Sequence, residues 1–202
     1  MLTTKDAIER RRSIRKFRPD PVPEDQITAL LDAARLAPSG SNAQPWRFKV
    51  VKDRDTKLRI AQSAFGQSFI GMAPVIFVCC VRTAGYYSSP ASKVQDLGRS
   101  GVIDEEAAKL KSDGYEETKP TSKAHLDARV AFNVAIAGEH MVLRALDFGL
   151  GSCWIRMFDE HKIKNIFGWD DSLHVAALLL IGYPDESPPA RKRLRIEDIL
   201  ID

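Results

Sequence analysis

The chain has 202 residues and a formal net charge of +3 at pH 7, with 28% charged and 44% hydrophobic residues. This length suits one well-buried domain over residues 1–202, the composition argues against disorder, and so small a charge gives no general reason to expect a nucleic-acid partner. No apolar run approaches the roughly 18 residues of a membrane span and the first residues lack a secretory signal, so we expect a cytoplasmic protein with no membrane partner.

The first helix is predicted from about Thr4 to Arg11, because Thr3 and Asp6 have the spacing of a capping box. A dense basic stretch follows as extended chain: Arg10-Arg11-Arg12-Ser13-Ile14-Arg15-Lys16-Phe17. Side chains alternate in extended chain, which predicts one face with Arg11, Ser13, Arg15 and Phe17 and another with Arg12, Ile14 and Lys16. Two guanidinium groups and a hydroxyl on one face suit a phosphate or the polar edge of a flavin. The alternative is a solvated basic helix end.

A second helix is predicted after Pro23, where Ile27, Leu30 and Ala34 follow at helical spacing. Pro38 ends it, and a polar loop follows that runs to Trp46. In this loop Asn42 and Gln44 each carry a donor and an acceptor, as does the edge of an isoalloxazine ring. The alternative is a loop whose Ser and Asn side chains cap their own backbone, with Trp46 as a core anchor.

Strands are predicted at Arg47 to Val51 and at Val75 to Val81, with a helix at Asp55 to Phe65 between them. The second strand is almost continuously apolar, as in a sheet covered on both faces. Its two cysteines, with Cys153 elsewhere, favour reduced core thiols over a disulfide framework. Residues 83–123 are polar and irregular, which indicates an insertion or lid with a short helix at Asp104 to Lys111.

The longest helical pattern runs from Leu126 to Phe148 and is rich in small residues, so it should pack closely against another helix or a second subunit. A strand at Ser152 to Ile155, a helix at Asp159 to Phe167 and a buried strand at His174 to Ile181 follow. The proline-rich, basic tail from Pro188 to Arg195 is predicted to be an extended arm. Together these elements predict an α+β fold, a sheet covered by helices without strict βαβ alternation.

Most common catalytic motifs are absent from the sequence. The four histidines are too irregularly spaced to propose a metal site, and there is no nucleophile elbow or P-loop. Gly149-Leu150-Gly151 begins like a dinucleotide fingerprint, but Trp154 stands where the third glycine belongs. A cofactor that brings its own reactive atoms is therefore the most direct route to an enzyme.

Four segments together resemble the nitroreductase family of FMN-dependent oxidoreductases. They are the N-terminal Arg-Arg-Ser-Ile-Arg-Lys-Phe, Ala-Pro-Ser-Gly-Ser-Asn-Ala-Gln-Pro-Trp after the second helix, Gly-Leu-Gly-Ser-Cys-Trp-Ile after the long helix, and the basic tail. Their order and spacing span nearly the whole chain, apart from residues 83–123. The resemblance implies a sandwich with a mostly antiparallel central sheet and an interlocked homodimer with two FMN sites at the subunit interface.

The same resemblance implies a set of flavin contacts. For the phosphate and the pyrimidine side of the ring they are Arg11, Arg12, Ser13 and Arg15, with Arg191 and Arg193 on the phosphate. From the partner subunit they are Pro38, Ser39, Ser41 and Asn42. Along the ring near N5 they are Trp154 and Ile155, with Gln67 at the ring edge. Trp-Ile-Arg-Met at 154–157 lacks the acidic residue that some family members carry there.

The expected reaction is ping-pong: NAD(P)H reduces FMN at N5, leaves, and is replaced by a nitroaromatic, a quinone or an activated alkene. A guanidinium such as Arg15 or Arg12 would stabilise the negative charge that the ring gains. Three alternatives stay open. They are a specialised flavoenzyme of the same family (a reductive dehalogenase or a flavin-fragmenting enzyme), a non-enzymatic flavin-binding protein, and a basic nucleic-acid module.

Overall fold

The computed structural model of the chain describes residues 2–82, 94, 97–117 and 122–201. The strands are β1 (Trp46–Val51), β2 (Val75–Arg82), β3 (Gly151–Ile155) and β4 (Leu173–Gly182). The helices are α1 (Thr4–Arg10), α2 (Glu24–Arg35), α3 (Arg54–Ser63), α4 (Ser68–Met72), α6 (Glu105–Glu117), α7 (Lys123–Ala145) and α8 (Glu160–Phe167). Short 3-10 turns lie at Gly40–Asn42, Leu146–Phe148 and Ile196–Asp198.

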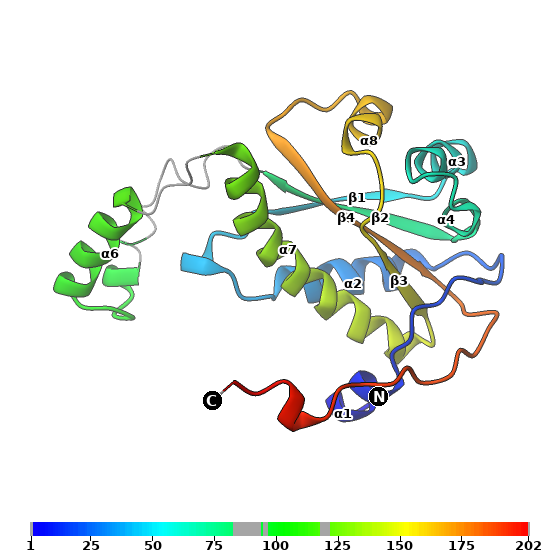
Figure 1. Ribbon diagram of the computed structural model, residues 1–202, viewed down its shortest axis with the longest axis horizontal. Coiled ribbons are helices and arrows are strands. Elements are labelled where there is room, and N and C mark those ends of the chain that lie inside the picture. Colours follow the sequence, from blue (N-terminus) through cyan, green and yellow to red (C-terminus); the bar gives the residue numbers. More distant parts are fainter. Residues whose placement is uncertain (1, 83–93, 95–96, 118–121, 202) are drawn as a thin grey trace.

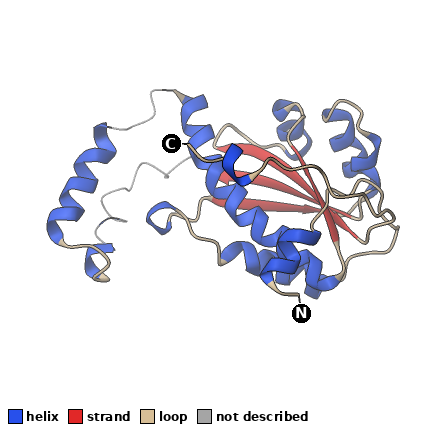
Figure 2. Ribbon diagram, turned by 60° about the horizontal axis from the view of Figure 1, so that its bottom comes forward, coloured by secondary structure: helices blue, strands red, loops and turns tan. Residues whose placement is uncertain are grey.

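The four strands form one sheet in the order β1-β2-β4-β3, and every neighbouring pair is antiparallel. The central strands β2 and β4 align Phe77 with Leu179, and their register shifts once, between Cys79 and Cys80. Figure 2 shows the strands fanning across the middle of the body between two groups of helices. The predicted mixture of helices and an antiparallel sheet is confirmed.

The sheet separates two apolar clusters, because alternate residues of β2 point to opposite faces. Phe77 and Cys79 face the cluster shared with α2 and α7, whereas Ile76 and Val78 face the cluster shared with α3 and α8. In Figure 1, α7 and α2 lie below the sheet and α3, α4 and α8 lie above it. Burial of β2 on both faces explains its continuous apolar sequence.

The local sequence signals were mostly correct. Thr3 and Asp6 form the predicted capping box at the start of α1. The three cysteines are free and buried, as predicted, and burial raises the pKa of Cys80 to about 12. No helix in the described part of the chain is both long and apolar enough to cross a bilayer.

Several predicted boundaries differ from the structure, and the largest differences are in the helices. Helix α6 continues to Glu117 instead of ending at Lys111, and α7 begins at Lys123 and tightens into a 3-10 turn over its last residues. Helix α4 was not predicted at all, because it has only five residues and no side-chain cap. Of the predicted lid, residues 83–93, 95, 96 and 118–121 lie outside the described residues.

Candidate functional site

Residues 11–18 run as extended chain between β3 and the segment that follows β4. The Ile14 N–H donates to the Ser152 carbonyl at 2.9 Å, and Ser13 and Ser152 form a parallel bridge. Further along, the Arg18 N–H donates to the Tyr183 carbonyl at 2.9 Å. The side chain of Ile14 is buried. The basic stretch is therefore extended, as predicted, and it is fixed to the edge of the sheet.

The C-terminal segment is held against the same stretch. The Asp185 N–H donates to the Lys16 carbonyl at 2.9 Å, and Glu186 Oε1 accepts from the N–H groups of Arg15 at 2.5 Å and Lys16 at 3.1 Å. The Arg15 N–H bond is the largest of the effects that hold the pKa of Glu186 below its ordinary value. A segment near each end of the chain therefore meets the other, at residues 15–18 and 183–186.

A cavity of about 370 Å³ lies where they meet, and we refer to it as the arginine cradle. It is lined by Arg11, Arg12, Ser13, Arg15, Pro188, Pro189, Arg191 and Arg193. Six of the residues predicted from sequence to contact a cofactor thus line one cavity. Permanently charged planar guanidinium groups beside a hydroxyl are suited to bidentate binding of an anionic phosphate.

The predicted division of the basic stretch into two faces was wrong for Arg12 and Phe17. Arg12 lines the cradle because α1 ends at Arg10 and the chain turns at Arg11, which has φ −53° and ψ 130°. Arg12 Nη1 also donates to the carbonyls of Glu9 and Arg11, both at 2.7 Å. Phe17 instead packs against the apolar cluster on the α8 side of the sheet.

Glu139 of α7 connects the cradle to β3. Its Oε1 lies 3.8 Å from Arg11 Nε, and its Oε2 accepts a 3.3 Å hydrogen bond from the indole N–H of Trp154. The indole ring lies against Gly138, where an added Cβ would come within 2.2 Å of Trp154 Cη2. Sequence analysis missed Glu139. The available signal was a carboxylate on a helix that is otherwise mostly apolar.

The other predicted contacts on this side of the molecule lie around β3. Trp154 is half-buried on the α7 side, whereas Ile155 is 5% exposed and faces the α8 side. Gln67 Nε2 donates to the carbonyls of Ala64 at 2.9 Å and Met157 at 3.2 Å. Gln67 is therefore hydrogen-bonded to the segment that follows β3. A residue that contacts the edge of a flavin ring lying along β3 would need this position.

The loop after α2 lies elsewhere. Figure 1 shows its light-blue turn on the α6 side of the body, away from α1 and the tail. The Gly40 N–H donates to Asn133 Oδ1 of α7 at 3.3 Å, and Ser39 Oγ accepts from the Gln44 N–H at 2.9 Å. Gln44 Nε2 donates to Asn42 Oδ1 at 3.0 Å.

These bonds match the alternative in which the loop side chains cap their own backbone, and Trp46 is a buried core anchor. Three of the four loop residues predicted as flavin contacts, Pro38, Ser39 and Asn42, are absent from the lining of the cradle among the residues that the structure describes. The side chain of the fourth, Ser41, lies outside the described part of the chain. A ligand in the cradle would meet this loop only if a second subunit supplied it.

Comparisons with known proteins identify the family and the fold. The family model described as the nitroreductase family matches residues 8–183. The chain is 31% identical over 201 residues to an NADH dehydrogenase of Thermus thermophilus, covering 100% of this chain and 96% of that one. Its fold is similar to that of a protein from Exiguobacterium sibiricum solved in complex with FMN, with a TM-score of 0.80, 22% identity and coverage of 100% and 97%. It is also similar to an NADPH:FMN oxidoreductase from Vibrio harveyi complexed with NAD+, with a TM-score of 0.74, 21% identity and coverage of 98% and 76%.

Proposed function

Because this chain belongs to the nitroreductase family, we propose that it is an FMN-dependent oxidoreductase that uses NAD(P)H to reduce an electron-poor acceptor. The acceptor would be a nitroaromatic, a quinone or an activated alkene. The observation that carries the proposal is the arginine cradle, in which guanidinium groups from both ends of the chain surround one cavity.

The cradle fits the phosphate end of FMN. Ser13 offers a hydroxyl, and Arg11 and Arg12 offer forks of N–H donors from the N-terminal side. On the C-terminal side, Arg191 and Arg193 line the cavity whereas Lys192 between them does not, which matches the alternation of an extended arm. A phosphate bound here would have its charge neutralised from both ends of the chain.

Bound FMN would supply a ring nitrogen that accepts a hydride from the nicotinamide and delivers it to the acceptor. The residues of this chain bind and orient it. Arg15 or Arg12 would stabilise the negative charge that develops on the pyrimidine side of the ring. Trp154, whose indole is fixed by Glu139 and Gly138, would form a rigid wall beside the ring. Donor and acceptor would use this one site in turn.

We infer that two subunits complete each site. Large apolar side chains are exposed on α7 and along the tail, with Phe132 at 68%, Leu194 at 71% and Ile196 at 73%. Such exposure is typical of a surface that a partner covers. In a dimer, the loop at Pro38 to Asn42 of one subunit could reach the cradle of the other, as the family resemblance implies.

The test is FMN binding to two neighbouring variants of the tail. Arg193→Gln removes a charge from the cradle, and Lys192→Gln removes one beside it. Loss of charge-assisted hydrogen bonds should raise the Kd for FMN about ten- to a hundredfold in Arg193→Gln. Lys192→Gln should stay within about twofold of the parent, since long-range attraction alone is screened by salt. Equal effects of the two variants would contradict a phosphate site in the cradle.

The visible spectrum of the purified protein then tests the reaction. Anaerobic NADH, followed by NADPH in a second sample, should bleach the flavin band, and menadione or nitrofurazone should restore it. Flavin that stays oxidised with both nucleotides would favour a non-enzymatic flavin-binding protein or a specialised member of the family. A colourless protein that does not take up added FMN would contradict the proposal as a whole.

A further inference from the structure

A second cavity, of about 200 Å³, lies between α7 and the β3–β4 edge of the sheet. It is lined by Ala131, Val134, Ala135, Glu139, Trp154, Arg156, Ala176 and Ala177. We refer to it as the Trp154 pocket. It adjoins the arginine cradle through Glu139, which contacts Arg11 on one side and Trp154 on the other.

Small side chains create this pocket. Ala131, Ala135 and Glu139 recur every four residues, so they lie on one face of α7, and alanines of β4 face them. Trp154 closes one side, with the end of its ring packed against Gly138. An apolar cavity of about 150 Å³ is enough to hold one benzene ring. The Trp154 pocket therefore has room for a single aromatic ring with a small substituent.

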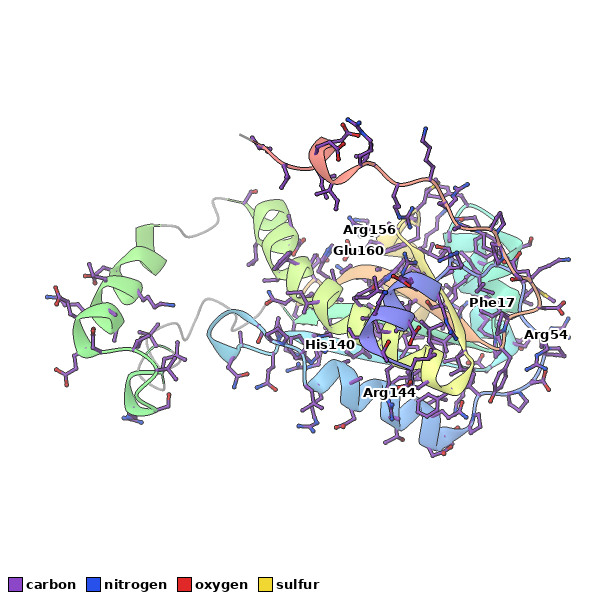
Figure 3. All side chains as sticks on the ribbon, turned by 90° about the horizontal axis from the view of Figure 1, so that it is seen from below. Phe17, Arg54, His140, Arg144, Arg156 and Glu160 are labelled. Atoms are coloured by element: carbon purple, nitrogen blue, oxygen red, sulfur yellow. The ribbon has the colours of Figure 1, made fainter. Side chains whose placement is uncertain are left out.

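Two charged groups line the pocket, the Glu139 carboxylate and the Arg156 guanidinium, and they differ in whether they are already paired. The Glu139 carboxylate is already engaged by Arg11 and by the indole N–H. Arg156 is exposed just after β3, and it makes no ion pair with the residues that the structure describes. Glu160, labelled with Arg156 in Figure 3, is engaged by Lys164 at 3.0 Å and His174 at 3.2 Å. The pocket thus has an apolar floor, an aromatic wall and one positive charge, on Arg156, that no carboxylate in the described part of the chain pairs with.

We propose that the Trp154 pocket receives the electron acceptor, and that Arg156 selects acceptors whose aromatic ring carries an anionic group such as a carboxylate. This rests on the proposed function, since it takes the flavin ring to lie along β3. The aromatic ring packs among the alanines against Trp154, and the carboxylate accepts hydrogen bonds from the Arg156 guanidinium. No covalent step is added to the hydride transfer.

The experiment compares two acceptors of almost equal size, para-nitrobenzoate and para-nitrobenzamide, on the FMN-loaded protein. The readout is the ratio of their kcat/KM values. One charge-assisted hydrogen bond should favour the benzoate about tenfold in the parent. Arg156→Gln should bring the ratio close to one, and Arg156→Lys should keep most of the preference. Arg54→Gln is the control: it loses the same charge at the start of α3, in the other helical layer (Figure 3), and should leave the ratio unchanged.

A binding measurement separates this inference from the proposed function. Calorimetric titration of para-toluate and para-toluamide, which are not reduced, should show the same tenfold preference and the same loss in Arg156→Gln. If no acceptor is turned over but toluate binding still depends on Arg156, the anion site stands and the oxidoreductase function fails. A ratio that Arg156→Gln leaves unchanged, or a fall in both rates by the same factor, overturns the selection by charge.

Discussion

Gly182, at the end of β4, lies where three segments of the chain pack together. A Cβ at this position would lie 2.5 Å from Cδ and 2.6 Å from Cγ of Pro74, and 3.0 Å from Cδ1 of Phe17. The proline ring cannot rotate away, so the space is closed on that side. The missing side chain lets the basic N-terminal stretch lie against the sheet, and that contact positions the arginine cradle.

We therefore predict that Gly182→Ala destabilises the protein. Overpacking of this kind costs about 1–3 kcal/mol, and the lower entropy of the unfolded chain offsets less than about 1 kcal/mol of it. The free energy of unfolding in guanidinium chloride should fall by about 2 kcal/mol, and FMN should bind more weakly because Phe17 must move.

The control is Gly114→Ala in α6, where an added Cβ meets no described atom within 4 Å. Alanine is the better helix former, so this variant should be as stable as the parent or slightly more stable. Equal stability of the parent and Gly182→Ala would show that Pro74 and the strand end can separate without loss.

At the scale of elements, α8 is held to the sheet by charges as well as by apolar contacts. The side chain of Lys164 is 5% exposed, and its Nζ lies 3.0 Å from Glu160 Oε1 and 3.1 Å from Asp171 Oδ1. Glu160 also accepts from the Val175 N–H at 3.0 Å, which ties the helix to β4. Burial alone would lower the pKa of Lys164, but bonds and charge from Glu160 and Asp171 outweigh it and raise the pKa.

The pKa of Glu160 moves the other way. Burial would raise it, but the Val175 N–H, Lys164 and the charge of His174 together lower it below the ordinary value. Glu160 therefore stabilises the fold fully at pH values above its ordinary pKa. This contribution is lost as the pH falls through the lower pKa that Glu160 has in the folded protein. Lys164 stabilises the fold fully at pH values below its ordinary pKa of 10.5. Its contribution is lost as the pH rises through the higher pKa that Lys164 has in the folded protein.

We predict that Lys164→Met lowers the free energy of unfolding by about 3 kcal/mol at neutral pH, because it leaves Glu160 without its closest cation. The difference from the parent should be greatest between about pH 5 and about pH 10, and should shrink at both ends as the ion pairs of the parent titrate. Lys162→Met is the matched control on the same helix. Its side chain is 68% exposed and 3.8 Å from Asp159, so it should change stability by less than about 0.5 kcal/mol. A constant difference across the pH range would contradict the assigned ion pairs.

Local patterns could predict these elements wherever they depend on nearby residues. The capping box at Thr3 was sufficient to predict the start of α1, and the apolar run at residues 75–81 was sufficient to predict β2. Both signals lie within a few positions of the sequence. Helix α4 could not be found in this way. It forms where Gly71 packs so closely on α3 that an added Cβ would lie 3.0 Å from Leu58 Cδ2, and that contact depends on tertiary structure.

At the scale of the whole molecule, the sequence indicated which kind of ligand binds better than it indicated how the residues of the site are arranged in space. Arginines near residues 11 and 193 can be read as anion-binding from their side chains alone. Their convergence depends on Tyr183 and Glu186 pairing with the N-terminal stretch, contacts between residues about 170 positions apart. Glu139 and Arg156 acquire a role only once α7 lies on β3. No sequence motif indicates that packing. Glu139 was therefore not predicted at all, and the segment with Arg156 was noted only because it lacks the acidic residue that some family members carry there.

The expected dimer gives the last prediction. One variant, Arg191→Gln with Arg193→Gln, damages the cradle, and a second, Ser39→Ala with Asn42→Gly, damages the loop; glycine tolerates the φ of 50° at position 42. If each site combines the cradle of one subunit with the loop of the other, a mixed dimer has one intact site and one doubly damaged site. Mixed dimers purified with two affinity tags should then bind about half as much FMN as the parent, although each variant alone binds little. If cradle and loop of the same subunit formed the site, both sites of the mixed dimer would be damaged and it would bind no more FMN than the variants.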